Sequence, residues 1–361
     1  MKIKSIIKCI IAVITVGAVA VGCGKSDGGS NGGDNGGTDP VVKKFTNPLL
    51  SSGPDPWIIR KGNYYYYTQT TGNGVKLWKT QYVDDLRNAT ATIVWTPPAG
   101  TAYSADVWAP ELHYLDNKWY IYVTAASAGN NASHRIYVLE NSSADPLNSG
   151  WVLKGKITDP TDKFAIDATV FTYKNDNYIV WSGWQGDMDG EQDLFIAKLS
   201  NPYTIEGERV MISKPTYDWE KISTGVNVLV NEGPEVVQNA NGNVFLTYSA
   251  NGCWSDDYCL GMLSLKQDGD PLNPTHWVKS STPVFIKNTN GGVFGPGHNG
   301  FFKSPDGKED WIIYHANSLS GQGCGDLRCP RIQKFTWDAN GAPVFGTPVG
   351  INTPTDKPSG E

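Results

Sequence analysis

The sequence predicts an all-β fold, a five-bladed β-propeller that residues 43–361 form as a single domain. The chain contains 17 Tyr, 13 Trp, 40 Gly and 22 Pro, and this abundance of aromatic and turn-forming residues is typical of proteins built from many short strands. Long amphipathic helical stretches are missing beyond the N-terminal segment. A two-strand pattern also recurs five times along the chain, and this repeat favours a propeller.

Each copy of the repeat starts with a polar residue and an apolar strand, which a polar turn joins to an aromatic-rich strand. The five copies are residues 55–70, 111–125, 167–183, 232–249 and 298–316. Their first residues are therefore 56, 56, 65 and 66 positions apart, and each interval has room for about four short strands, the content of one propeller blade. A β-sandwich would also contain many short strands, but it gives no reason for a regular repeat.

The first residues of the five copies are expected to meet in one central pocket, because the innermost strand of each blade lines the propeller axis. They are Asp55, Glu111, Asp167, Glu232 and His298. Unpaired buried acids are costly, so such a cluster usually binds a ligand or performs chemistry. Hydrolysis of a glycosidic bond requires one carboxyl group as acid and another as base, and a negative charge nearby raises the pKa of the acid. The residues by themselves do not assign these roles.

Short segments around these residues resemble glycoside hydrolase family 43. They are Gly53–Trp57, Val107–Glu111, Ala165–Phe171, Asn231–Pro234 and Gly295–Asn299. The resemblance covers nearly all of residues 45–350, in order. It implies a five-bladed enzyme that inverts the anomeric centre, with Asp55 as general base, Asp167 as pKa modulator and orienting residue, and Glu232 as general acid.

The same resemblance implies further site residues. His298 matches a position beneath the substrate near a bound water or ion, commonly calcium; a hydrogen-bonded core histidine is the alternative. Arg328 matches an arginine that contacts the sugar in the terminal subsite, with Arg331 as the second candidate and a surface salt bridge as the alternative. Glu111 is expected to contact substrate in the same pocket. The chemistry itself requires no cofactor.

Tryptophans are candidates for stacking against sugar rings, although most of the 13 must belong to the core. Trp57 and Trp108 adjoin the leading acids, and Trp184 lies with Trp254 in predicted rim loops, so these residues are expected to contact substrate.

The expected partner is a plant cell-wall oligo- or polysaccharide. The segments Trp181–Trp184 and Tyr248–Trp254 resemble the exo-acting α-L-arabinofuranosidases of the family, which release arabinose from arabinan or arabinoxylan. A β-xylosidase, an endo-arabinanase and a non-catalytic sugar-binding lipoprotein are the alternatives. The net charge of -6 argues against a nucleic-acid partner, which usually requires a clustered basic face.

The N-terminal segment predicts export. A basic start precedes the apolar run 9–21, which is too short for a comfortable membrane span. The ending Ala20–Cys23 resembles a bacterial lipobox, so residues 1–22 are predicted to be a lipoprotein signal peptide and Cys23 to carry lipid; an ordinary cleaved signal is the alternative. Residues 23–42 are predicted to form a flexible tether. The expected location is the bacterial envelope, periplasmic or at the cell surface, with a lipid anchor as the only membrane contact.

Four cysteines beyond Cys23 fall into two close pairs, Cys253 with Cys259 and Cys324 with Cys329. Outside the cytoplasm, close pairs favour disulfide bonds that fix local loops. Zinc is the alternative, but no histidine stands at ligand spacing from either pair. The sequence therefore predicts two local disulfides.

Overall fold

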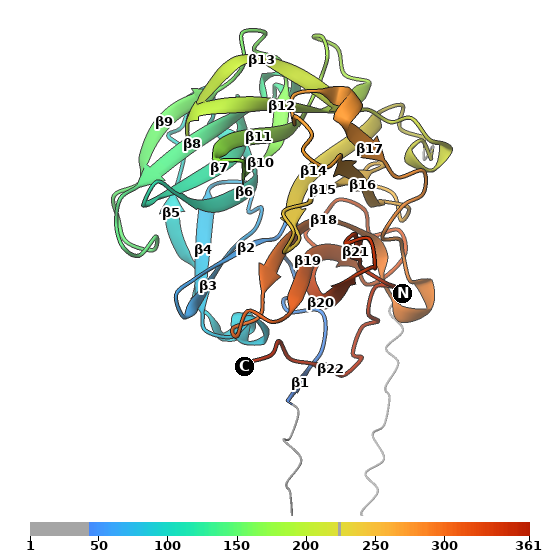
Figure 1. Cartoon of the computed structure of the whole chain (residues 1–361). Coiled ribbons are helices and arrows are strands. Elements are labelled where there is room, and N and C mark those ends of the chain that lie inside the picture. The colour runs from blue at the N-terminus through green and yellow to red at the C-terminus, as the bar shows by residue number, and fades with distance from the viewer. Residues whose placement is uncertain (1–42, 223–224) are drawn as a thin grey trace, which may run out of the picture. The chain divides into compact units, whose positions relative to one another are not determined.

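The computed structural model describes residues 43–222 and 225–361. The predicted signal peptide, the lipidated Cys23 and the tether up to residue 42 lie outside the described residues. From residue 43 onward the chain forms successive sheets arranged around a central axis (Figure 1).

Five groups of four strands follow one another along the chain, and each group is one blade whose strands run from the axis outward. Three blades are separate four-stranded sheets, and the third and fourth blades together form one eight-stranded sheet. The first two blades consist of β2 (Trp57–Lys61), β3 (Tyr64–Thr68), β4 (Val75–Thr80) and β5 (Thr92–Trp95), then β6 (Ala105–Leu115), β7 (Lys118–Ala126), β8 (Arg135–Asn141) and β9 (Val152–Ile157). The third and fourth consist of β10 (Ala165–Tyr173), β11 (Asp176–Gly183), β12 (Glu191–Asn201) and β13 (Thr204–Ser213), then β14 (Leu229–Gln238), β15 (Val244–Ala250), β16 (Cys259–Leu265) and β17 (Trp277–Lys279). The fifth consists of β18 (Phe294–Lys303), β19 (Asp310–Asn317), β20 (Cys329–Trp337) and β21 (Pro343–Val344). The predicted five-bladed propeller is thereby confirmed.

Within each blade the pairing is antiparallel, and a short parallel pairing of β12 with β14 joins the third and fourth sheets. The described helices are short 3-10 turns in the connections: η1 (Val83–Asn88), η2 (Asn131–Ser133), η3 (Asp218–Glu220), η4 (Pro274–His276) and η5 (Thr289–Gly291). None of the helices in the described ranges has the length and apolar character needed to cross a membrane.

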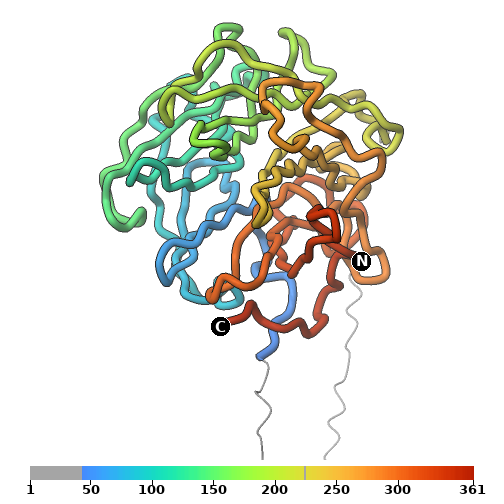
Figure 2. Tube along the Cα trace, in the orientation of Figure 1, coloured from blue at the N-terminus to red at the C-terminus, as the bar shows by residue number. Residues whose placement is uncertain are grey.

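The ring closes where the first blade lies beside the fifth (Figure 2). An apolar cluster fills this junction and includes Ile58 and Tyr65 from one side and Phe302 and Trp311 from the other. The side chain of Asn47 donates to the carbonyl of Ile332 at 2.8 Å and accepts from its N–H at 3.0 Å. Strand β1 (Lys44–Phe45) also pairs with β22 (Thr355–Asp356), which brings the two ends of the described chain together.

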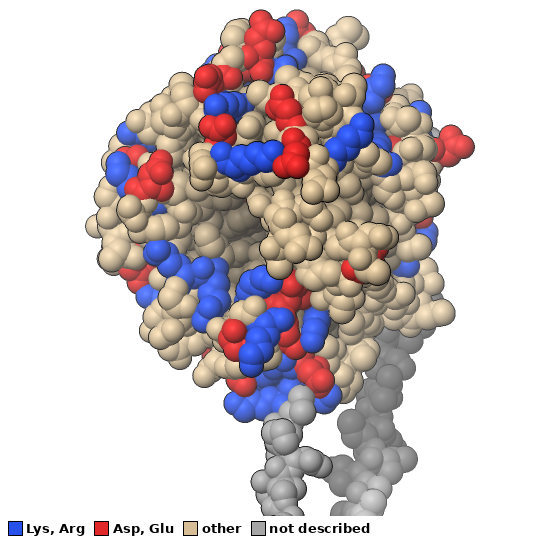
Figure 3. Space-filling view, viewed as in Figure 1, with Lys and Arg blue, Asp and Glu red and all other residues tan. Residues whose placement is uncertain are grey.

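Charged side chains of both signs are interspersed over the face shown in Figure 3, around a hollow whose visible surface is mostly uncharged. Several form ion pairs, for example Arg135 with Asp162 and Lys163 with Asp187, each at 2.7 Å. Exposed pairs of this kind contribute at most about 1 kcal/mol each. The apolar clusters between blades therefore dominate the stability of the ring.

A residue with positive φ stands near the start of every innermost strand. These residues are Asp55 (54°), Ala109 (41°), Asp167 (56°), Gly233 (52°) and His298 (46°). Continuous pairing with the second strand starts two residues later in each blade, at Trp57, Glu111, Thr169, Glu235 and Gly300. In the last four blades the positive-φ residue lies in a register shift, and such bulges re-aim side chains next to active sites.

This register corrects the predicted alignment of the repeat. Ala109, not Glu111, is the equivalent of Asp55, and Glu111 stands two residues further along its strand, level with Glu235. Glu232 stands one residue before the equivalent position, which Gly233 occupies. The prediction failed here because an alignment on polar residues cannot detect where a bulge falls.

The predicted disulfide pairing is also wrong. Cys253 bonds to Cys324, whereas Cys259 and Cys329 are free and buried. Cys253 and Cys324 lie in the β15–β16 and β19–β20 loops of neighbouring blades, and their Cα atoms are 5.0 Å apart, within the range that a disulfide requires. Cys259 and Cys329 instead start strands β16 and β20. Distance in space, rather than distance along the chain, decides the pairing.

Candidate active site

A pocket of about 480 Å³ opens where the innermost strands begin, and the three predicted acids line it together. Asp55 directly precedes β2, Asp167 lies in the bulge of β10, and Glu232 lies beside the bulge of β14. His298 from β18 and Arg328 from the loop before β20 also line the pocket. The bulges thus turn polar groups from separate blades toward one space.

Asp55 is surrounded by groups that favour its ionised form. Arg328 Nη1 lies 2.8 Å from Oδ1, and the Thr70 hydroxyl donates to Oδ2 at 2.6 Å. The Nδ1 atoms of His298 and His315 both lie 3.4 Å from Oδ1. Burial alone would raise the pKa of Asp55, but these neighbours outweigh it and hold the pKa well below its usual value. Arg328 is the permanent charge among them, because burial lowers the pKa of both histidines.

The surroundings of Asp167 and Glu232 instead favour the protonated form of these two residues. Burial and then the charge of Glu232 raise the pKa of Asp167, although the Gly233 N–H donates to its Oδ2 at 3.2 Å. Burial also raises the pKa of Glu232, to about 7, against the hydrogen bond that Tyr258 donates to its Oε1 at 2.9 Å. The site therefore contains one carboxylate that stays ionised and a carboxyl pair that retains a proton near neutral pH.

Gly233 is required beside Glu232 for two reasons. Its φ of 52° lies in the left-handed region, which glycine adopts without strain. A Cβ atom at this position would also lie 3.1 Å from the ring of His298. A side chain here would displace either the general-acid candidate or the histidine.

One wall of the pocket is apolar and aromatic. It includes Trp108, Phe164, Ile166, Val226, Val228 and Trp254. The ring of Trp108 packs against His134 with centroids 4.2 Å apart, and Trp184 stacks behind Phe164 at 4.3 Å. Trp108 is thus available to a sugar ring, whereas Trp184 is 3% exposed and supports the wall from behind.

Two other predicted contacts also point away from the pocket. The indole N–H of Trp57 donates to the carbonyl of Leu112 at 2.9 Å, so this side chain packs between the first two blades. Glu111 lies outside the pocket lining, buried with Oε2 2.8 Å from His113 Nε2. The predictions for Trp57, Glu111 and Trp184 as substrate contacts are therefore wrong.

Of the two predicted arginines, the pocket contains Arg328. Arg331 is fully buried, donates to the Ser318 hydroxyl at 2.8 Å and does not line the pocket. Arg328 lies in the loop before β20 and reaches Asp55 from there, whereas Arg331 lies within β20 with its side chain buried.

The calcium expected near His298 can be tested against the donors present. Calcium prefers six to eight oxygen ligands, whereas His298 offers a ring nitrogen, and the nearby Asp55 is already paired with Arg328. Across residues 43–222 and 225–361, no three His, Cys, Asp or Glu side chains are arranged to hold a metal ion. These residues do not fit a calcium held by the protein, and we derive no step through one.

Three residues of the site were not predicted from the sequence. Thr70 donates to Asp55 and accepts from the N–H of Ala109, and it ends the first copy of the repeat. Tyr258 reaches Glu232 from a loop between two cysteines. His315 accepts the backbone N–H of Asp55 at 3.0 Å from within β19. The contacts of Tyr258 and His315 join different parts of the chain, and that of Thr70 depends on the folding of its hairpin, so the local pattern carries no signal for them.

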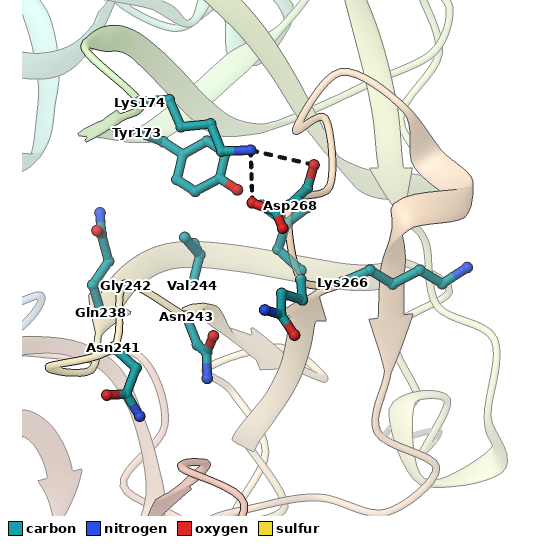
Figure 4. Close-up of a pocket in the computed structure, with 11 residues that line it drawn as sticks. Tyr173, Lys174, Gln238, Asn241, Gly242, Asn243, Val244, Lys266 and Asp268 are labelled. Carbon is teal, nitrogen blue, oxygen red and sulfur yellow. Dashed lines mark hydrogen bonds and ion pairs between the residues drawn. The ribbon is translucent and has the colours of Figure 1, made fainter.

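Figure 4 shows residues that line a second hollow, of about 330 Å³, which none of the three acids lines. Tyr173 and Lys174 line it at the far end of β10, and Tyr173 lies six positions beyond Asp167, a distance of about 20 Å along a strand. Lys174 pairs with Asp268 across it at 3.2 Å. Its amide and charged lining contains none of the chemistry of the acidic pocket.

Comparison with known proteins agrees with the geometry of the acidic pocket. Residues 45–343 match the family described as Glycosyl hydrolases family 43. An extracellular exo-α-(1→5)-L-arabinofuranosidase of Streptomyces avermitilis is 42% identical over 312 residues, which are 84% of this chain and 64% of that protein. The α-L-arabinofuranosidase 43 of Humicola insolens is 40% identical over 313 residues, again 84% of this chain and 64% of that protein.

A solved structure supports the same assignment. The α-L-arabinofuranosidase from Lactobacillus brevis has a TM-score of 0.79 to this chain at 38% identity, covering 86% of this chain and 98% of that one. The two sequence relatives are longer, and this chain spans about 64% of their length. The family match extends over most of the described propeller. The chain belongs to glycoside hydrolase family 43.

Proposed function

We propose that this protein is an inverting glycoside hydrolase that releases terminal α-L-arabinofuranose from arabinan, arabino-oligosaccharides or arabinoxylan. The observation that carries the proposal is the divergence of pKa between two carboxyls in one pocket. The pKa of Asp55 lies below its usual value, and that of Glu232 is raised to about 7. Such a pair supplies a base and an acid at the same pH.

In the proposed reaction, Asp55 accepts a proton from a water molecule as the water oxygen attacks the anomeric carbon. Glu232 donates its proton to the glycosidic oxygen as the bond from the anomeric carbon to that oxygen breaks. Asp167 accepts the Gly233 N–H and lies near enough to Glu232 for the two charges to interact, so it holds the acid in place and opposes its ionisation. Arg328 keeps Asp55 ionised and lies where it can also meet a sugar hydroxyl.

The proposed sugar and the proposed exo action are inferred from the names of related proteins. The proteins from Streptomyces avermitilis and Humicola insolens are named as arabinofuranosidases, the first of them exo-acting and extracellular. By the same reasoning we infer export and a plant polysaccharide as partner. The lipid anchor at Cys23 remains part of the proposal on the strength of the lipobox-like segment Ala20–Cys23.

The activity is tested by assaying purified residues 43–361 on 4-nitrophenyl α-L-arabinofuranoside, linear arabinan and 4-nitrophenyl β-xyloside. We expect arabinose as the product from both arabinosides and little action on the xyloside. Asp55→Asn should lower kcat by about 10²–10⁴-fold, the range typical for loss of a general base. Cleavage of the xyloside without release of arabinose would overturn the proposed substrate, and unchanged activity of Asp55→Asn would overturn the proposed base.

A further inference from the structure

The hydroxyl of Tyr258 contacts the proposed general acid directly. Tyr258 stands one residue before β16, is 1% exposed and donates to Oε1 of Glu232 at 2.9 Å. Among the described residues, no side chain or backbone donor reaches the other oxygen, Oε2. The two oxygens of Glu232 are therefore not equivalent.

The ring of Tyr258 is confined on several sides. It stacks on His315 with centroids 5.6 Å apart and planes 6° from parallel. Gly297 borders the ring edge, where a Cβ atom would lie 2.3 Å from Cε1. The buried Ser249 lies on β15, and its hydroxyl accepts the backbone N–H of His298 at 2.8 Å, so this side of the pocket is also held by hydrogen bonds. This confinement fixes where the hydroxyl points.

The same stack reaches the proposed base. Nδ1 of His315 accepts the backbone N–H of Asp55 at 3.0 Å, so the ring beneath Tyr258 is itself hydrogen-bonded to the chain at the base. Tyr258 and His315 thus form a packed connection between Glu232 and Asp55. A shift of either ring would change the separation of acid and base.

Resting on the function proposed above, we propose that Tyr258 is a positioning residue that fixes the acidic proton of Glu232 on Oε2. A carboxylic acid has one O–H group, and an oxygen that accepts a strong hydrogen bond serves as the carbonyl oxygen. With Oε1 occupied by the tyrosine, the proton resides on Oε2. Tyr258 does not touch the reacting atoms and acts through Glu232.

This arrangement has a consequence for pH dependence. A donor to a carboxyl oxygen stabilises the ionised form most, so it lowers the pKa of the acid. Loss of the Tyr258 hydroxyl should therefore raise the pKa of Glu232 and move the alkaline limb of kcat/KM to higher pH. A purely structural role for the ring would lower activity without moving this limb.

The test compares Tyr258→Phe with the wild-type protein on two substrates that share a sugar. Departure of 4-nitrophenolate needs little protonation, whereas departure of arabinose from α-1,5-arabinobiose needs a proton from the acid. We expect kcat/KM to fall about tenfold or more on arabinobiose, the loss typical of one hydrogen bond to a charged group, and much less on the nitrophenyl substrate. Equal losses on both substrates with an unmoved alkaline limb would overturn the proposal.

Tyr248→Phe is the matched control. Tyr248 is also fully buried in the fourth blade, and its hydroxyl donates to Glu220 at 3.0 Å, away from the acids. This variant should lose stability comparably in a thermal melt but show no dependence on the leaving group. Leaving-group dependence of the same size in Tyr248→Phe would contradict a specific role for Tyr258.

A second measurement covers the case in which Tyr258→Phe does not fold. Site-specific replacement of Tyr258 by 3-fluorotyrosine keeps the ring and strengthens the donor, so the alkaline limb should move to lower pH, opposite to the shift in Tyr258→Phe. An unmoved limb would refute the proposal.

Glu232→Gln separates this proposal from the proposed function: it should abolish hydrolysis of arabinobiose while retaining part of the nitrophenyl activity. If Glu232→Gln still cleaves arabinobiose, the proposed acid itself is wrong.

Discussion

Asp55 and Glu232 carry the same functional group, and their neighbours give them different protonation states. Asp55 lies against the permanent charge of Arg328 and accepts from Thr70, so its carboxylate is stabilised. Glu232 is buried and accepts one hydrogen bond, from Tyr258, so its neutral form persists to higher pH. The chemistry of the pocket therefore depends on the groups that contact Asp55 and Glu232, as well as on the two acids themselves.

The pH profile of kcat/KM should be bell-shaped. The alkaline limb should lie near the pKa of Glu232, about 7, because the acid loses its proton as pH rises through that value. The acidic limb should lie below the usual pKa of an aspartate, because Asp55 stays ionised to low pH. Steady-state rates on arabinobiose between pH 3 and 9 measure the alkaline limb and show whether activity persists at the acidic end of this range. An acidic limb above pH 5 would contradict the assigned state of Asp55.

Replacing Arg328 tests the origin of that low pKa. In Arg328→Met the carboxylate loses its ion pair, so the pKa of Asp55 should rise and the acidic limb should move to higher pH. We expect kcat/KM to fall about tenfold to hundredfold, the loss typical of a charge-assisted hydrogen bond. Arg331→Met is the control, since Arg331 is buried outside the pocket and should affect the melting temperature without moving the limb. An equal shift of the acidic limb in Arg328→Met and Arg331→Met would contradict the conclusion that Arg328 lowers the pKa of Asp55.

At this scale the sequence predicts the grouping of the acids well and the contacts around them poorly. Asp55, Asp167 and Glu232 stand at or next to the start of an innermost strand in their blades, so the repeat predicts their convergence although Glu232 lies one residue before the equivalent position. Trp57 and Trp184 also stand beside site segments, but their side chains face the inter-blade core or the back of the wall. Neighbouring residues on a strand face opposite sides, so proximity in sequence to a site residue does not place a side chain in the pocket.

At the scale of elements, the bulges of the innermost strands decide which side chains enter the pocket. In the second blade the positive-φ position is Ala109, which brings no functional group, and Glu111 falls two residues deeper. Polarity alone suggested Glu111 as the equivalent of Asp55. The left-handed conformation that marks the true position depends on tertiary packing, so it could not be located from the residue types.

The Cys253–Cys324 disulfide joins two loops that form the pocket wall. Trp254 adjoins one sulfur, and Arg328 follows the other by four residues. Ser320 and the Gly321 N–H also donate to Asp256, so hydrogen bonds reinforce the covalent link between the loops. These loops belong to different blades, which is why the local cysteine spacing misled the prediction.

The double variant Cys253→Ser, Cys324→Ser should be less stable and bind substrate more weakly. The bond closes a separation of 71 residues, and chain entropy assigns such a link up to about 4 kcal/mol. We expect KM to rise more than kcat falls, because the wall loosens while the acids keep their places. Thermal melts with and without dithiothreitol check the assignment: the reductant should lower the melting temperature of the wild type and leave the double variant unchanged. Cys259→Ser serves as the control and should keep its sensitivity to reductant.

At the scale of the whole molecule, five similar blades bury apolar faces against one another around a centre that holds buried polar side chains. The regular spacing and aromatic strands of the sequence predict this ring. The elements that close it are not visible in the sequence, because β1 and β22 are two residues each and the Asn47 contact depends on the folded ring. Local patterns specify the blades, whereas closure is a property of the assembled fold.

The innermost strands β6 and β14 contribute a buried carboxyl pair, Glu111 and Glu235, outside the pocket lining. Burial and then the charge of Glu235 raise the pKa of Glu111, and burial likewise raises that of Glu235. The Thr169 hydroxyl donates to Glu235 at 3.2 Å, and His113, whose pKa burial lowers to about 3, brings no positive charge to Glu111 near neutral pH. The folded protein therefore keeps protons here that the unfolded chain releases.

This pair should make the fold less stable as pH rises. The folded-state pKa of Glu235 is raised, so stability is lost once pH exceeds the unfolded value of about 4.3. Glu235→Gln removes the ionisable group, so we expect the variant to have a higher melting temperature than the wild type at pH 8, with a smaller gain at pH 5. Exposed Glu208→Gln is the control for a change of net charge. An equal gain in the melting temperature of Glu235→Gln at pH 5 and pH 8 would contradict the conclusion that Glu111 and Glu235 retain protons.

The stereochemistry of the product tests the central claim most directly. If Asp55 activates water while Glu232 protonates the leaving oxygen, the sugar is displaced in one step and its anomeric configuration inverts. Proton NMR during hydrolysis of 4-nitrophenyl α-L-arabinofuranoside by the wild-type protein should show β-L-arabinofuranose first, with the α anomer appearing later by mutarotation. Initial appearance of the α anomer would require a covalent intermediate and would contradict the account.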